Sequence, residues 1–139
     1  MKILFSLDRE EKIDPNDALG DIIISSDDGE ISVRSTYLDS WFSALIEGYD
    51  SLQKNQNIKI DIIEEPESIT FERLFNKFKI SYGKQHITFK KIEDFYQCLS
   101  ITIKDFMQQF EQENIKLSSY PLFTEICHFQ NHFKIKELI

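Results

Sequence analysis

The stretch LDSWFSALIEGYDSL, residues 38–52, decides the fold because its apolar side chains recur at intervals of three and four residues. This spacing places them on one face of an α-helix. The residues of that face are Leu38, Trp41, Phe42, Leu45, Ile46, Tyr49 and Leu52. We therefore predict an amphipathic helix of about four turns whose apolar face is buried in the core.

Two details of this helix can also be read from the sequence. Thr36 and Asp39 are three residues apart and resemble a capping box in which Asp replaces the usual Glu. Gly48 lies inside the helix, where it costs about 1 kcal/mol relative to Ala. We expect a neighbouring element to pack closely there.

The residues before the helix predict three strands. Residues 1–7 alternate between apolar and polar side chains, and a polar loop over residues 8–19 follows them. Two further alternating runs flank SSDDGE, residues 25–30. This pattern predicts a hairpin in which Gly29 supplies the positive φ of the turn.

The residues after the helix predict more strands and two more helices. Strand patterns cover residues 57–65, 68–74, 76–82 and 85–90, with a tight turn over residues 82–85. A long helix begins at Ile92. The apolar stripe of this helix comprises Phe95, Leu99, Ile103, Phe106 and Phe110.

Residues 114–119 form a linker to a final helix. Pro121 suits the first turn of this final helix. The apolar side of that helix holds Phe123, Ile126, Cys127 and Phe133.

The element order indicates an α+β fold in a single domain, residues 1–139. The order is one strand, two strands, a helix, three or four strands, and two helices. Consecutive strands joined by tight turns favour a mainly antiparallel sheet of about six strands with the helices on one face. Because most strands alternate in polarity, we expect the other sheet face to remain in water.

The charge is distributed unevenly along the chain. The net charge is −8, yet residues 1–70 hold six Lys and Arg against sixteen Asp and Glu, and the remainder holds ten against eight. An acidic half argues against binding of nucleic acid or anionic membranes, and favours a basic protein partner. The candidate partner-binding residues are Asp27, Asp28, Glu30, Glu47, Asp50, Glu64, Glu65 and Glu67. They form one negative field if the fold brings them together, and separate solvated turns if it does not.

The sequence gives no pattern for a metal, a cofactor or a catalytic residue, so we expect a protein that is not an enzyme. A calcium loop needs a Glu about six residues after Gly29, where Ser35 and Thr36 stand instead. His128 and His132 share a helix face beside Cys127, but further ligands at zinc spacing are missing. Nucleophile and phosphate-binding motifs are also missing. An enzyme whose acid–base groups meet only in the fold stays open as an alternative.

Cysteine use and hydropathy favour a cytoplasmic protein. Cys98 and Cys127 form no Cys-x-x-Cys pair and lie in apolar helical stretches, so we expect buried, unpaired thiols. No run approaches the roughly 20 apolar residues of a membrane span. The first residues have too short an apolar run for a signal peptide.

The chain resembles the immunity proteins of bacterial contact-dependent growth inhibition and related polymorphic toxin systems. The similarity lies in the opening strand, the hairpin over residues 21–35, the helix LDSWFSALIEG and the Phe-rich C-terminal part. It is a resemblance of overall type and assigns no functional residue. It implies a tight, stoichiometric complex with a cognate toxin domain, often a basic nuclease, formed by a protein that is a monomer when free.

The alternative class is a type III secretion chaperone, which is also small, acidic and α/β, and binds an effector as a dimer. Such chaperones usually open with an amphipathic helix, whereas this chain opens with a strand. A stable dimer in the absence of a partner favours the chaperone, and a monomer favours the inhibitor.

Overall fold

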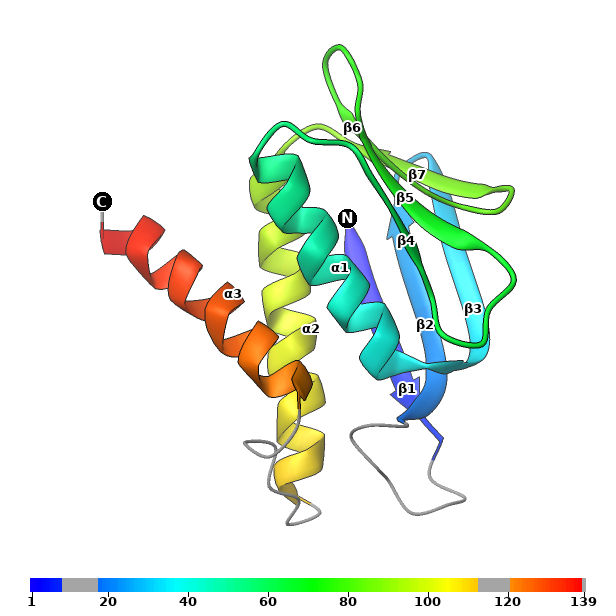
Figure 1. Ribbon diagram of the computed structural model, residues 1–139, viewed down its shortest axis with the longest axis vertical. Helices are drawn as coiled ribbons and strands as arrows, with labels where there is room; N and C mark the ends of the chain where they lie inside the picture. The colour runs from blue at the N-terminus through cyan, green and yellow to red at the C-terminus, as the bar shows by residue number, and fades with distance from the viewer. Residues whose placement is uncertain (9–17, 113–120, 139) are drawn as a thin grey trace.

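The computed structural model describes residues 1–8, 18–112 and 121–138 and is an α+β fold (Figure 1). Its strands are β1 (Lys2–Leu7), β2 (Leu19–Ser26), β3 (Gly29–Tyr37), β4 (Ile58–Asp61), β5 (Ser68–Arg73), β6 (Phe78–Tyr82) and β7 (Gln85–Phe89). Its helices are α1 (Leu38–Gln53), α2 (Ile92–Gln112) and α3 (Pro121–Leu138). The predicted order of strands and helices is confirmed.

The strands form two antiparallel sheets, with orders β1-β2-β3 and β4-β5-β6-β7, where we predicted one sheet of about six strands. The sheets meet where the start of β3 lies beside β7. There the Ser32 N–H donates to the side-chain oxygen of Gln85 at 2.8 Å. Because the side chain of Gln85, rather than a backbone carbonyl, accepts the hydrogen bond from Ser32, the backbone hydrogen-bond ladder does not continue from β3 to β7. The strands therefore form two sheets.

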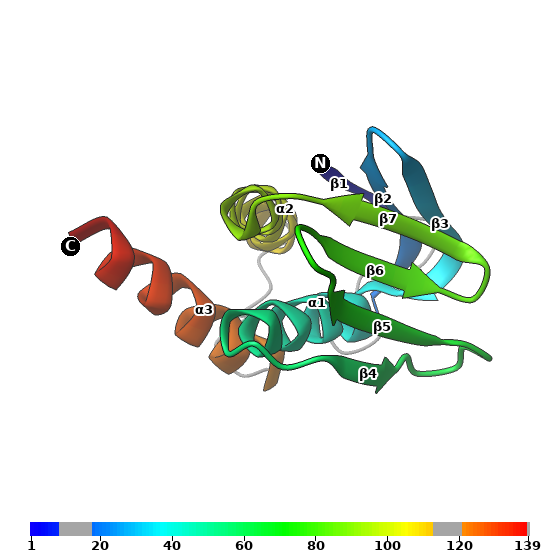
Figure 2. The same ribbon diagram turned by 90° about the horizontal axis from the view of Figure 1, so that it is seen from above.

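Helices α1 and α2 lie next to each other on the same side of the strands, and α3 lies beyond them (Figure 2). α1 packs on β4 and β5, and α2 packs on β1 and β7. The seven apolar residues predicted for the buried face of α1 are all buried. The α2 stripe is buried as well, so the core is a cluster of aromatic and aliphatic side chains between helices and sheets.

The free edge of β1 is covered by α2. The Cys98 thiol donates to the Met1 carbonyl oxygen, and the Thr102 hydroxyl donates to the Ile3 carbonyl oxygen, both at 2.7 Å. An uncovered edge strand is a template for pairing with another chain. The β-branched residues at 101–103 therefore sit in a helix that protects a strand edge.

Gly29 does not supply the positive φ that we predicted for the β2–β3 turn. Positive φ among the described residues occurs at Ser35, Asn55, Glu64 and Gly83. Gly29 is required for another reason, because a Cβ there would lie 2.2 Å from the carbonyl oxygen of His86. Its role is the close approach of the hairpin to β7.

The predicted capping box at the start of α1 is also wrong. Thr36 belongs to β3, and Tyr37 is the N-cap without a side-chain hydrogen bond. The Trp41 indole N–H donates to the buried Thr36 hydroxyl at 2.8 Å. Asp39 instead accepts from the Ala18 N–H at 3.3 Å. Both side chains serve tertiary contacts.

Several other predictions are modified or remain outside the described residues. β4 ends at Asp61, before the predicted residue 65, and the chain turns through a positive φ of 64° at Glu64. Cys98 and Cys127 are free but only partly buried. Residues 9–17 of the predicted loop, the linker at 114–119 and the side chain of Phe133 lie outside the described part. No described helix is long and apolar enough to cross a membrane.

Candidate partner-binding groove between α1 and α3

Of the three carboxylates of the β2–β3 hairpin, Asp28 makes hydrogen bonds within the protein, and Asp27 and Glu30 are exposed to solvent. Asp28 accepts hydrogen bonds from the Ser26 hydroxyl at 2.5 Å, from the Thr88 N–H at 3.1 Å and from the Thr88 hydroxyl. These hydrogen bonds, led by the one from Ser26, hold the pKa of Asp28 well below its usual range. Asp28 therefore joins the hairpin to β7, while Asp27 and Glu30 are exposed at the turn.

The strand-end carboxylates also differ from one another. Glu65 accepts from the Tyr82 hydroxyl at 3.1 Å. Burial, with the Glu65 carboxylate as the second cause, raises the pKa of Tyr82 to about 12. Glu67 lies against Gly83 in the β6–β7 turn. Glu64 is exposed.

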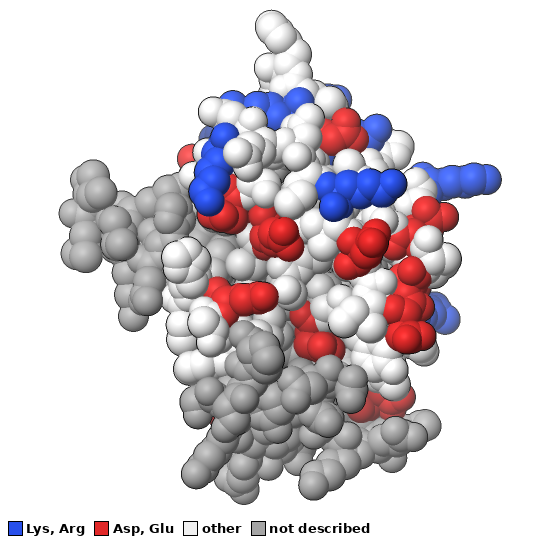
Figure 3. Space-filling view, viewed as in Figure 1, with Lys and Arg blue, Asp and Glu red and all other residues white. Residues whose placement is uncertain are grey.

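Two carboxylates of α1, Glu47 and Asp50, are exposed. Both are on the solvent side of this helix, and Lys54 pairs with Asp50 at 3.0 Å. The Ile63 N–H donates to the Ser40 hydroxyl at 3.1 Å, which holds the start of the β4–β5 loop against α1. Figure 3 shows Asp and Glu gathered over the middle of this side, with Lys and Arg at its upper end.

The eight predicted residues consequently do not form one cluster, since Glu65 and Glu67 contact β6 and the β6–β7 turn. Asp28 contacts β7, whereas the exposed carboxylates of α1 and Glu64 belong to the side where α1 meets β4. β7 and β4 are the two edges of the four-stranded sheet. Three strand spacings, about 14 Å, separate these edges.

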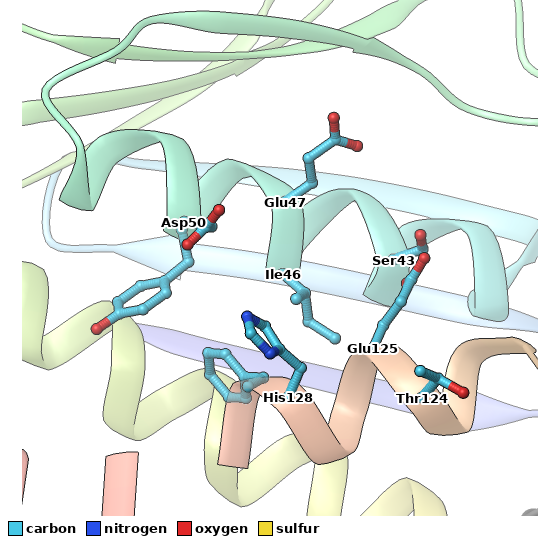
Figure 4. Close-up of a pocket in the computed structure, with 9 residues that line it drawn as sticks. Ser43, Ile46, Glu47, Asp50, Thr124, Glu125 and His128 are labelled. Carbon is cyan, nitrogen blue, oxygen red and sulfur yellow. The ribbon is translucent and has the colours of Figure 1, made fainter. Parts of the chain in front are cut away.

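A groove of about 410 Å³ lies between α1 and α3 (Figure 4). Its lining residues are Ser43, Ile46, Glu47, Tyr49, Asp50, Thr124, Glu125, His128 and Phe129. Figure 4 shows Glu125 and His128 extending from α3 toward α1, with Ile46 pointing into the space between the helices and Glu47 pointing away from α3. The groove thus has an apolar floor and an acidic rim.

Aromatic packing of α3 forms the floor. Ile126 and Phe129 are three residues apart and are the buried side of the described part of α3. The Phe129 ring lies 5.4 Å from the ring of Tyr49 and 4.7 Å from the ring of Tyr96. Burial, with the neighbouring Tyr96 as the second cause, raises the pKa of Tyr49 to about 12, so its hydroxyl stays neutral. Short side chains at Ser43 and Thr124 leave the space above this floor open.

This arrangement suits an apolar side chain that is flanked by cationic groups. Its volume falls in the range of roughly 300–1,000 Å³ that is typical of ligand sites. The described residues hold no group of three side chains placed to bind a metal. His128, considered for zinc from the sequence, is an exposed rim residue here, and the side chain of His132 lies outside the described part.

Sequence reasoning identified Glu47 and Asp50 but missed Thr124, Glu125 and Phe129. The spacing of Ile126 and Phe129 could have indicated a packed face on α3. The sequence holds no signal that this face packs against α1, because that contact joins segments about 80 residues apart. The groove exists only in the tertiary structure.

Comparison with known proteins assigns no family to this chain. No protein-family model matches it, and no curated protein or solved structure matches it significantly. The proposals below therefore depend on the residues and their geometry.

Proposed function

We propose that this protein is an immunity protein that binds a basic toxin domain and neutralises it in a stoichiometric complex. The binding surface that we propose is the acidic face, defined as Glu47, Asp50, Glu64 and Glu125. The observation that carries the proposal is the position of Glu47, Asp50 and Glu125 at an apolar groove. Glu64 is exposed in the loop that the Ile63–Ser40 hydrogen bond holds against α1. A basic partner gains attraction from the rim and apolar contact from the floor.

The charges of the acidic face are available to a partner. All four residues are exposed. Within the described part of the chain, the ion pair of this face is Lys54 with Asp50, an exposed pair that contributes little to stability. Uncompensated carboxylates on one side of a protein steer a cationic partner and accelerate its encounter.

The hairpin residues Asp27 and Glu30 provide a matched comparison. They are equally exposed and acidic but lie beside β7, on the other edge of the sheet. Reversing two charges in either place changes the net charge by the same amount. A difference between the two double variants therefore reports where the partner binds.

The test uses, as the probe, the C-terminal domain of the large secreted protein that we expect the neighbouring reading frame to encode. We expect a 1:1 complex with this chain and protection of cells that express the domain. Glu47→Lys with Glu64→Lys should slow association roughly tenfold with a smaller change in dissociation. Asp27→Lys with Glu30→Lys should leave association within about twofold. The absence of a complex, or equal effects of the two double variants, would contradict the proposal.

A further inference from the structure

The turn between β5 and β6 carries a fully exposed aromatic side chain. Arg73 pairs with Phe78 across the hairpin, and the Leu74 N–H donates to the Lys77 carbonyl oxygen at 2.8 Å to close the turn. Phe75 lies inside this turn and is 104% exposed. Figure 1 shows that the hairpin extends beyond the rest of the molecule. Phe75 is therefore an apolar knob with open access from solvent.

Cationic residues flank this turn in the sequence. Arg73 and Lys77 flank the turn, and Lys79 follows on β6. The Arg73 guanidinium lies 5.1 Å from the centre of the Phe78 ring, a cation–π contact that keeps it beside the turn. Lys and Arg gather at the same end of the molecule in Figure 3. We call residues 73–77 the basic tip.

The basic tip and the groove are complementary in charge, and each presents an apolar surface. The tip presents an aromatic ring between two cationic residues, and the groove presents an apolar floor with Glu47, Asp50 and Glu125 among its lining residues. The described residues that line the groove belong to α1 and α3, with none from the tip, so the tip of a chain does not fill the groove of the same chain. We infer that the basic tip of one copy docks into the groove of a second copy.

This contact is heterologous, because it joins two different surfaces. Each bound pair keeps one free tip and one free groove, so further copies can add head to tail. A Phe side chain buries about 150–250 Å². The contact is then smaller than the roughly 1,200 Å² of stable interfaces. We expect weak, concentration-dependent association of a chain that is a monomer when dilute, and competition with any basic partner that uses the acidic face.

The test is sedimentation velocity of the full chain alone, from about 10 μM to about 1 mM, a range that covers weak dissociation constants. We expect the average sedimentation coefficient to rise with concentration and to fall with added salt. Phe75→Ser, the tip variant, and Glu47→Lys with Glu125→Lys, the groove variant, should each weaken association at least roughly tenfold. The control is Ile101→Ser, which removes an exposed apolar side chain on α2 that is 69% exposed, and it should associate as the unchanged protein does.

Mixing the variants tests the head-to-tail geometry itself. A tip variant still has its groove, and a groove variant still has its tip, so a mixture should form dimers that do not grow further. A wild-type chain that stays monomeric over the whole range, or a mixture that does not associate, would overturn the inference. So would Phe75-dependent binding to vesicles of phosphatidylserine and phosphatidylcholine by a monomeric chain, which would assign the tip to a membrane. No toxin is present in these experiments, so their outcome is independent of the proposed function.

Discussion

Two polar side chains in this protein, Asp28 and Thr36, each fix one contact of the fold. The structure uses Asp28 to hold the hairpin against Thr88, and Thr36 to accept the indole N–H of Trp41. Asp28 and Thr88 are 60 residues apart in the sequence. A spacing rule that covers one turn or one helix end cannot detect such a contact.

Asp28→Asn should lower the free energy of unfolding at neutral pH and should make that free energy less dependent on pH in the acidic range. The folded-state pKa of Asp28 lies below its unfolded value, so its contribution is present above about pH 4 and is lost as pH falls toward the folded pKa. We expect a loss of about 1 kcal/mol at pH 7, since the carboxylate is exposed and screened, and a smaller loss at pH 2.5. Urea unfolding at both pH values measures this. Asp27→Asn is the control, and an equal effect of the two substitutions would contradict the role of Asp28.

Thr36→Val should destabilise the fold because it leaves the buried Trp41 N–H without its acceptor. The expected loss in the free energy of unfolding is about 1–3 kcal/mol. Thr36→Ser keeps the hydroxyl and should retain most of the free energy of unfolding that Thr36→Val loses. Urea denaturation followed by Trp41 fluorescence gives both values, and equal stability of the Val and Ser variants would argue against the hydrogen bond.

Whole elements were more predictable than single residues. The spacing of apolar residues located α1 and α2, and the strand patterns predicted about six of the seven strands, because both kinds of pattern report which face of an element is buried. The division into two sheets was not predictable, since it depends on Gly29 approaching the His86 carbonyl and on Gln85 bridging to Ser32. The groove was not predictable either, because its floor needs α3 to pack on α1.

Gly48→Ala tests how closely α1 packs on β5. Ala favours a helix by about 1 kcal/mol over Gly. A Cβ at this position would nevertheless lie 2.4 Å from the Phe71 ring. We expect the steric cost of the added Cβ to exceed the gain in helix propensity, so that the free energy of unfolding falls by about 1–2 kcal/mol. In the Phe71→Leu background the same substitution should become neutral or stabilising, and thermal unfolding of the four proteins checks this. A stabilised single variant would contradict the contact.

At the scale of the molecule, the fold converts a charge imbalance along the sequence into separate surfaces. Among the described residues of the first half, Glu47, Asp50 and Glu64 belong to the acidic face, and Asp27 and Glu30 belong to the hairpin beside β7. The basic tip lies at the end of the β5–β6 hairpin. Counting charges predicted an acidic partner surface in general terms. The location of that surface and its apolar groove follow only from the packing of α1 against β4, β5 and α3.

The most direct test of the acidic face is the ionic-strength dependence of its association rate with the basic toxin domain that we propose as its partner. For the unchanged protein, and for Asp27→Lys with Glu30→Lys, the rate constant should fall steeply as salt increases. For Glu47→Lys with Glu64→Lys, we predict a rate that is slow at low salt and nearly independent of salt. The same steep dependence in all three proteins would contradict the account.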